Sequence, residues 1–223
     1  MCYYDSKYST FSEVIHVNRA NLILEIFDTY KNRTREEILE NLNIAIALGR
    51  DRRMPVDRYV ALPEVTNRSK HSVMSWFNRE HKKIPLIDLC MIADYLNYNL
   101  FAFFNTENFG KKTKGDFLLA NEMANAKYPP DSAKIFIKAS KLQYDTDKDT
   151  IVDNLEKYFG YTKDIKKAHS NERQKKIMEI CNCNKHTYIS WFNRSRKNVR
   201  VPLASLCKLA NAAEIDIFDM FRC

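Results

Sequence analysis

Residues 69–80 read SKHSVMSWFNRE, and residues 184–195 read NKHTYISWFNRS. The only two tryptophans of the chain, Trp76 and Trp191, lie 115 residues apart at the centre of these stretches. At this spacing, Lys70, His71, Ser75, Phe77, Asn78 and Arg79 recur as Lys185, His186, Ser190, Phe192, Asn193 and Arg194. Two inserted residues later, Pro85, Leu86, Leu89, Cys90, Ala93, Phe101 and Phe104 recur as Pro202, Leu203, Leu206, Cys207, Ala210, Phe218 and Phe221. A repeat this long predicts a duplicated domain rather than a solenoid.

Both copies have the apolar spacing of a helix. Val73, Trp76 and Phe77 follow the i, i+3, i+4 pattern in the first copy, and Tyr188, Trp191 and Phe192 follow it in the second. Ser69 and Asn184 occupy the position of an N-cap, where a side-chain oxygen accepts from free backbone N–H groups. Pro85 and Pro202 then open a further helix with an apolar stripe. We therefore expect Trp76 and Trp191 in the core.

The remaining helical patterns set the expected domains. Helices are predicted over residues 36–48 and 151–158, with shorter ones over 58–66 and 172–181, and one amphipathic helix over 21–30. The predicted fold class is all-α, with two tandem helix-turn-helix bundles of four to five helices each. The bundles cover residues 34–104 and 150–223. Residues 105–149 are interpreted as a partly ordered linker, and residues 1–33 as an extension without a partner in the repeat.

Composition narrows the functional classes. The formal net charge is +8 and the isoelectric point is near 9.1, which favours an anionic partner. Four Gly and six Pro provide little turn chemistry for an all-β fold. The sequence contains no run of about 18 apolar residues, so no membrane span is expected. The first residues lack the layout of an export signal, so we expect a cytoplasmic protein whose cysteines are thiols.

The short helix, tight turn and capped helix of each copy are typical of a helix-turn-helix. The arrangement resembles the Cro and phage-repressor (XRE-like) family of DNA-binding domains, over about residues 35–104 and 150–221. The residues that match its pattern are Ser69, Ser72, Val73 and Trp76 in one copy, and Asn184, Thr187, Tyr188 and Trp191 in the other. The resemblance implies binding to double-stranded DNA and control of transcription, with no cofactor.

Two features depart from the family pattern. Asn67 and Asn182 stand where the turn glycine is usual, and asparagine tolerates the left-handed backbone that such a turn needs. Pro63 falls inside the expected short helix of the first copy, so that helix is expected to start late or to kink.

The face opposite the apolar stripe is the candidate surface for reading bases. The residues expected there are Lys70, His71, Met74 and Ser75, with Lys185, His186, Ile189 and Ser190 in the second copy. In the resembled family, the first residues of this helix lie at base edges in the major groove. Lysine can donate to guanine, histidine can donate or accept, and Met or Ile can contact a thymine methyl group. The alternative is that the lysines are merely solvated and that Met74 and Ile189 pack inward.

Basic loops follow each of these helices and are predicted to contact phosphates. The predicted phosphate contacts are Arg68, Asn78, Arg79, Lys82, Lys83, Asn193, Arg194, Arg196, Lys197 and Arg200. Residues 163–200 hold eleven Lys or Arg against three Asp or Glu, a local net charge of +8. The second copy is therefore expected to bind DNA more strongly than the first.

Other interpretations remain open at this level. The chain could be a protein-interaction module built on helix-turn-helix folds that no longer bind DNA, and a homodimer is possible. The WFNRSRK stretch also resembles the third homeodomain helix, although one residue is missing between Phe and Asn. No catalytic motif is present, so an enzyme is not expected. Cys181 and Cys183 lack the spacing of a zinc site and are interpreted as buried thiols, with no metal expected.

Overall fold

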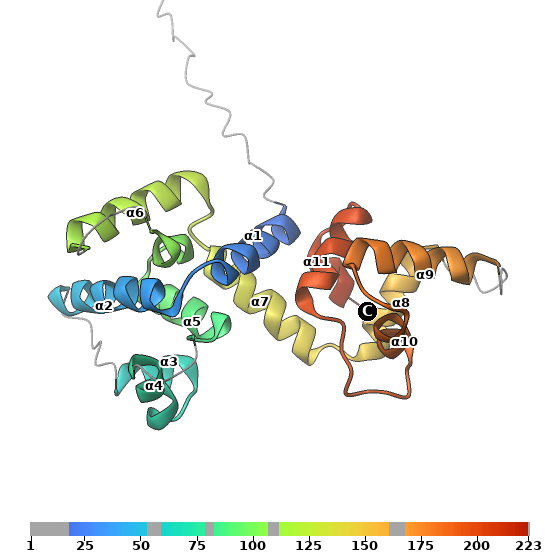
Figure 1. The fold of residues 1–223 in the computed structure, drawn as a ribbon, viewed down its shortest axis with the longest axis horizontal. Helices are drawn as coiled ribbons and strands as arrows, with labels where there is room; N and C mark the ends of the chain where they lie inside the picture. The colour runs from blue at the N-terminus through green and yellow to red at the C-terminus, as the bar shows by residue number, and fades with distance from the viewer. Residues whose placement is uncertain (1–17, 53–58, 79–82, 107–111, 161–167, 223) are drawn as a thin grey trace, which may run out of the picture.

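The computed structural model describes residues 18–52, 59–78, 83–106, 112–160 and 168–222, and all regular structure in them is helical (Figure 1). The N-terminal half contains α1 (Arg19–Lys31), α2 (Arg35–Asp51), α3 (Ala61–Thr66), α4 (Lys70–Phe77), α5 (Leu86–Leu96) and the 3₁₀ helix η1 (Leu100–Phe104). The C-terminal half contains α7 (Ser132–Asp145), α8 (Lys148–Tyr158), α9 (Ala168–Cys181), α10 (Lys185–Phe192), α11 (Leu203–Ala212) and η2 (Ile217–Phe221). α6 (Lys114–Lys127) lies between them in the chain. The predicted all-α class is confirmed.

The α3–α4 and α9–α10 turns have the same backbone. Asn67 and Asn182, which end α3 and α9, have φ values of 52° and 49°, in the left-handed region that asparagine tolerates. Ser69 Oγ then accepts from Ser72 N at 3.1 Å, and Asn184 Oδ1 accepts from Thr187 N at 2.9 Å. The predicted N-caps are confirmed.

Pro63 shortens α3 without kinking it. α3 begins at Ala61, so Pro63 lies in the first turn, where its missing N–H costs no helical hydrogen bond. The equivalent helix α9 has no proline and starts earlier than its predicted first residue, 172. The prediction that Pro63 would delay the helix is therefore confirmed, although residue 58 of the expected range lies outside the described residues.

An asparagine fixes each 3₁₀ helix in the same way, buried in the N-terminal half and half-buried in the C-terminal half. Asn41 Nδ2 on α2 donates to the carbonyl oxygens of Phe103 (2.9 Å) and Asn105 (3.0 Å) at the end of η1. On α8, the equivalent Asn154 Nδ2 donates to the carbonyl oxygens of Met220 (3.2 Å) and Arg222 (2.7 Å) at the end of η2. Each amide thereby satisfies carbonyl groups that the end of a helix leaves without partners.

A cation at the start of α2 and α8 anchors the helix that follows the turn. Arg35 donates to the carbonyl oxygens of Trp76 and Asn78, at the C-terminal end of α4. Lys148, only 3% exposed, donates through Nζ to the carbonyl oxygens of Ser190, Asn193 and Arg196 at 2.8–2.9 Å. Positive charge at the negative end of the helix dipole stabilises α4 and α10 in place.

α1 and α7 join the two halves. α1 packs on α11 of the C-terminal half, and α7 packs on α5 of the N-terminal half. The two helices meet between the halves, where the rings of Phe27 and Phe136 lie edge to face with centroids 5.2 Å apart (Figure 1). Each half therefore contributes its first helix to the core of the other.

α1 and α7 also occupy equivalent places in the repeat. At a spacing of 113 residues, the buried Ala20, Ile23 and Ile26 of α1 match the buried Ala133, Phe136 and Ala139 of α7. The sequence interpretation did not recognise this match, and it assigned α1 to an extension and α7 to a linker. In the structure both helices belong to the helical body.

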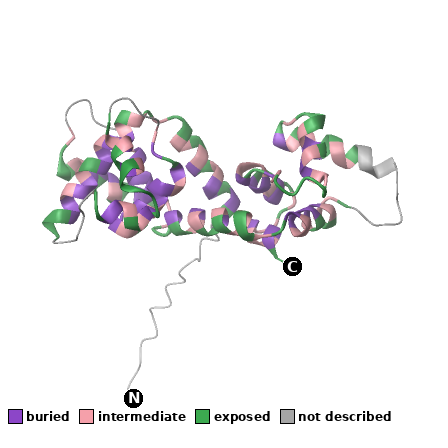
Figure 2. Ribbon diagram, turned by 90° about the horizontal axis from the view of Figure 1, so that it is seen from below, coloured by how far each residue is buried: buried purple, intermediate pink, exposed green. Residues whose placement is uncertain are grey.

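Among the helices that the structure describes, α6 has no counterpart in the other half. It packs on α2 and η1, and its Phe117 ring meets the rings of Tyr98 and Phe103 edge to face. Elsewhere, the buried residues gather on the inner faces of the helices in both halves (Figure 2). Trp76 and Trp191 are each 5% exposed, so their predicted place in the core is confirmed.

Candidate nucleic-acid interface

The outer face of α4 carries three residues that the sequence analysis placed on a base-reading surface. Val73 and Trp76 are buried, which turns Lys70, His71 and Met74 to solvent. Met74 is 40% exposed, a large fraction for an apolar side chain on a helix with a buried face. The alternative that Met74 packs inward is therefore wrong.

α10 presents the same set of residue types. Tyr188 and Trp191 are buried, while Lys185, His186 and Ile189 are exposed, with Ile189 at 45%. The two halves thus expose a lysine, a histidine and an apolar side chain at matching positions of matching helices. We call this shared face the reading face. It consists of Lys70, His71, Met74, Lys185, His186 and Ile189.

Ser75 and Ser190 do not belong to the reading face. Both are half-buried, and their hydroxyls donate to backbone oxygens one turn earlier, Ser75 to Ser72 at 2.6 Å and Ser190 to Thr187 at 2.8 Å. This hydrogen bond holds the hydroxyl against its own helix. The structure does not bring these serines together with the predicted base-reading residues.

In the N-terminal half, two of the predicted phosphate contacts are occupied within the protein. Arg68 Nε lies 3.1 Å from both carboxylate oxygens of Asp88, which is buried. Lys83 Nζ donates to the carbonyl oxygens of Tyr30 and Arg33, and burial lowers its pKa. Both cations are bound by groups of the fold, although the Arg68 side chain remains 46% exposed.

Of the other predicted phosphate contacts in the N-terminal half, the structure describes Asn78 alone. Asn78 is exposed, and its backbone oxygen accepts from Arg35. Arg79 and Lys82 lie outside the described residues. Among the described lysines of this half, Lys70 is therefore the one exposed on the reading face.

In the basic loop of the C-terminal half, some side chains are bound by other parts of the protein and others are exposed. Arg194 forms ion pairs with Asp149, Asp153 and Glu156 of α8, and the hydrogen bond to Asp153 raises its pKa. Three carboxylates around one guanidinium leave little positive field for a phosphate.

The other loop residues of the C-terminal half complete this division. Arg200 Nη1 donates to the carbonyl oxygens of Gln143 (2.6 Å) and Thr146 (2.9 Å). Asn193 Oδ1 accepts from the backbone N–H of Ser195 at 3.0 Å. Arg196 and Lys197 are exposed, and the backbone carbonyl of Arg196 is itself one of the acceptors of Lys148. Lys185, Arg196 and Lys197 are thus the cations of the predicted set that this half exposes.

Sequence reasoning missed Arg35 and Lys148 as positioning residues. Their signal was present, because each is the basic residue directly after an N-cap (Thr34 and Asp147) and they are 113 residues apart. The pattern did not reveal their partners, which are backbone carbonyls far along the chain.

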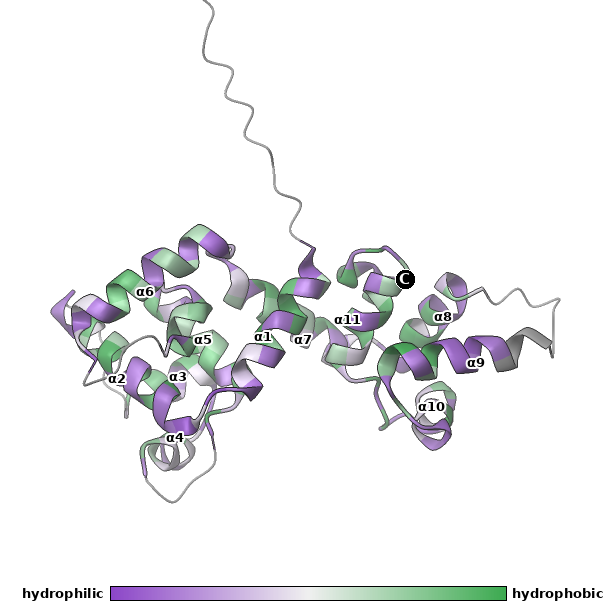
Figure 3. Cartoon of the chain, turned by 45° about the horizontal axis from the view of Figure 1, so that its top comes forward, coloured by the Kyte–Doolittle hydropathy of each residue, from purple (hydrophilic) through white to green (hydrophobic). Residues whose placement is uncertain are grey.

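α4 and α10 lie on the same side of the molecule. Both are below α1 and α7 in Figure 3, one in each half. The reading face is therefore carried by two helices on one side of the protein, with α1 and α7 between them.

The cysteines give no metal site among the described residues, where no three His, Cys, Asp or Glu side chains gather closely enough to hold an ion. Burial raises the pKa of the Cys181 thiol to about 11 and that of Cys207 to about 12, and it also raises the pKa of Cys90. A metal ligand must be a thiolate, which burial disfavours here.

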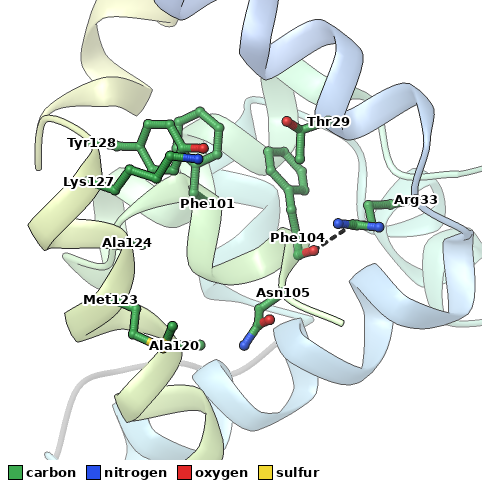
Figure 4. A pocket seen from close by; sticks show the side chains of 10 residues that line it. All are labelled: Thr29, Arg33, Phe101, Phe104, Asn105, Ala120, Met123, Ala124, Lys127 and Tyr128. Atoms are coloured by element: carbon green, nitrogen blue, oxygen red, sulfur yellow. Dashed lines mark hydrogen bonds between the residues drawn. The ribbon is translucent and has the colours of Figure 1, made fainter. Parts of the chain in front are cut away.

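A cavity of about 290 Å³ lies between α1, η1 and α6 (Figure 4). Phe101, stacked on Tyr128 with centroids 3.6 Å apart, forms one wall, and Arg33 lies at the opposite side. α6 and α4 are on opposite sides of the N-terminal half in Figures 1 and 3. The cavity is therefore separate from the reading face.

Comparisons with protein-family models, curated proteins and solved structures found no match to this chain. Among the helices that the structure describes, none is long and apolar enough to cross a membrane.

Proposed function

We propose that the chain is a sequence-specific DNA-binding regulator of transcription that uses two tandem helix-turn-helix units. The units are α3–α4 and α9–α10 with their supporting helices, and the reading face enters the major groove. The observation that carries the proposal is the exposure of the same three residue types on α4 and on α10. The exposed Met74 and Ile189, at matching positions of a duplicated helix, are suited to contact a thymine methyl group.

The exposed cations support the same proposal. Lys185 belongs to the reading face, the exposed Arg196 and Lys197 follow α10 in the chain, and a net charge of +8 favours an anionic partner. In this proposal Arg35 and Lys148 are positioning residues, because they hold the C-terminal ends of α4 and α10 against the bundle.

The protein-interaction alternative is favoured by one observation in the N-terminal half. Tyr59 and Val60, just before α3, are 39% and 61% exposed, and Met74 is exposed as well. Arg68 pairs with Asp88 and Lys83 is bound by backbone carbonyls, whereas on α10 the exposed large apolar side chain among the described residues is Ile189. A protein partner for the N-terminal half is therefore the second candidate function.

Selection from random duplex DNA with the full-length protein tests the proposal. We expect enrichment of a defined motif and an affinity that falls steeply with salt, because phosphate contacts release counterions. A log–log salt slope near zero, or no enriched motif at low salt, would contradict DNA binding and favour the interaction alternative.

Two variants separate the predicted roles within the C-terminal half. His186→Ala should lower the preference for the selected motif by about 1–3 kcal/mol at one or two base pairs, because it removes a base contact. Arg196→Ala should weaken selected and unrelated duplexes by the same factor, since phosphates carry no sequence. If His186→Ala also weakened both duplexes equally, the assignment of the reading face would be wrong.

A further inference from the structure

We infer that one molecule of this protein binds two half-sites in inverted orientation on the same duplex, without a second copy of the chain. The inference rests on the proposed function and adds the architecture of the DNA site. Its basis is the way in which α1 and α7 relate the two halves.

The interface between the halves is reciprocal at the level of elements. α1 of the first repeat packs on α11 of the second, and α7, the equivalent of α1, packs on α5, the equivalent of α11. In a head-to-tail arrangement, one of these two surfaces would remain uncovered. Reciprocal contact of the same two patches is the property of a two-fold relation.

The interface is also reciprocal residue by residue. Asn211 Nδ2 donates to Asn21 Oδ1 at 2.6 Å, and the residues at the equivalent positions, Asp94 and Lys134, form an ion pair at 3.6 Å. The side chains differ between the two pairs, but the pairing of positions is the same.

A second pair of positions repeats this relation. Arg19 forms an ion pair with Asp216, the cap of η2. The equivalent Ser132 Oγ lies 3.5 Å from Asn99 Oδ1, the cap of η1. Two independent pairs of contacts therefore relate the halves by an approximate two-fold axis that passes between α1 and α7.

This axis determines how the two reading helices approach DNA. α4 and α10 are equivalent, they lie on the same side of the molecule, and a two-fold axis runs between them. B-form DNA also has two-fold axes perpendicular to its length, so two helices related in this way read opposite strands. The half-sites must then be inverted, with their centres about 34–36 Å or a multiple of that distance apart.

The reading residues set how similar the half-sites are. The lysine and histidine are identical in α4 and α10, while Met74 in one helix corresponds to Ile189 in the other. The inverted site is therefore an imperfect one, with half-sites that share most of their base pairs.

The test uses the full-length protein and the half-site found by selection. Duplexes carry that half-site once, or twice in inverted or direct orientation over a series of spacings. Affinity is measured at one fixed salt, and stoichiometry by sedimentation. At one spacing, we expect the protein to bind the inverted duplex at least about 100-fold more tightly than a single half-site, because the second contact is intramolecular. We also expect one protein per duplex.

A variant connects the gain to both helices. Lys185→Ala combined with His186→Ala should reduce binding to the inverted duplex to the level of a single half-site, with the fold still intact by circular dichroism. Direct repeats that bind as tightly as inverted ones, or two proteins on each inverted duplex, would overturn the inference and leave DNA binding itself standing. No binding to any duplex would overturn the proposed function together with the inference.

Discussion

Single polar side chains repeat their role across the two halves even where the surrounding sequence differs. Asn41 and Asn154 each bind two carbonyl oxygens at the end of a 3₁₀ helix. The sequence contains the pair Asn-Leu at both places, so the equivalence could be seen, but not the role. The acceptors are backbone atoms 62 to 68 residues away, and no local pattern marks them.

Replacing the buried amide should destabilise the fold. Asn41→Ala removes the donor to the Phe103 carbonyl, one of two donors to the Asn105 carbonyl and an acceptor of Lys112 Nζ. We therefore expect a loss of about 1–3 kcal/mol in the free energy of unfolding. Urea denaturation followed by circular dichroism measures it. Asn43→Ala, on the exposed side of the same helix, is the matched control and should change stability little. Equal effects from the two variants would contradict the structural role of Asn41.

Thiol reactivity distinguishes buried cysteines from a metal site. At pH 8, Cys181 and Cys207, with pKa values of about 11 and about 12, hold very little thiolate. Iodoacetamide should therefore modify them roughly 100-fold or more slowly than an ordinary cysteine, and more slowly than the less buried Cys183. Peptide mapping by mass spectrometry gives the rate at each site. Joint exposure of Cys181 and Cys183 to the reagent only after a chelator is added would instead indicate bound zinc.

Charged residues show where sequence reasoning reaches its limit. Loop position correctly placed Arg196 and Lys197 at the surface, but the same argument applied to Lys83, Arg194 and Arg200. Those three are held by carbonyl or carboxylate oxygens of other elements. A run of basic residues shows where positive charge lies in the sequence, but the tertiary fold determines which groups neutralise it.

At the scale of elements, α3 and α9 show how one position can accept proline in one half alone. Pro63 is in the first turn of α3, while the equivalent Met178 lies in the third turn of α9. The turn that follows is the same in both, since Arg68 N and Cys183 N donate to the carbonyl oxygens of Pro63 and Met178, each at 3.0 Å. The late start of α3 was predictable from Pro63, because proline has a fixed φ and no N–H.

This difference predicts an asymmetric response to substitution. Pro63→Ala should change the free energy of unfolding by less than about 1 kcal/mol. Met178→Pro should lower it by about 3 kcal/mol or more, because it removes a hydrogen bond inside α9 and clashes one turn earlier. Met178→Ala controls for the lost side chain. Thermal unfolding of the three variants measures the effects, and a tolerated Met178→Pro would show that the inner turns of α9 contribute little.

The helix α1 was predicted from the sequence over residues 21–30, but its equivalence to α7 was not. Its match to α7 lies in the burial pattern: Ile23 corresponds to Phe136 and Ile26 to Ala139, and the alanine is the same at Ala20 and Ala133. A core tolerates such exchanges when volume is conserved overall. The repeat could be recognised around α4 and α10, where a Trp and a basic loop are retained. It could not be recognised between α1 and α7, where only the apolar character is retained.

For the whole molecule, the exchange of α1 and α7 makes the halves mutually dependent. Each half lacks part of its core without the first helix of the other. Two tandem domains on a linker would unfold separately, whereas this arrangement predicts one cooperative transition.

The two tryptophans report on this coupling, since Trp76 lies in one half and Trp191 in the other. In Trp191→Phe the fluorescence of Trp76 follows the N-terminal half, and in Trp76→Phe that of Trp191 follows the C-terminal half. Within each variant, we expect the fluorescence and circular dichroism curves in urea to coincide. Two separated midpoints within one variant would mean that the halves fold independently.

Joining both halves in one polypeptide also changes how the protein can evolve. In a homodimer every substitution is made twice, so any change must suit both subunits. Here Pro63 and α6 exist in one half alone, and the other half keeps a longer α9 in the place of α3. The two halves can therefore diverge separately, so that one can adapt to a new partner while its twin maintains the original contact.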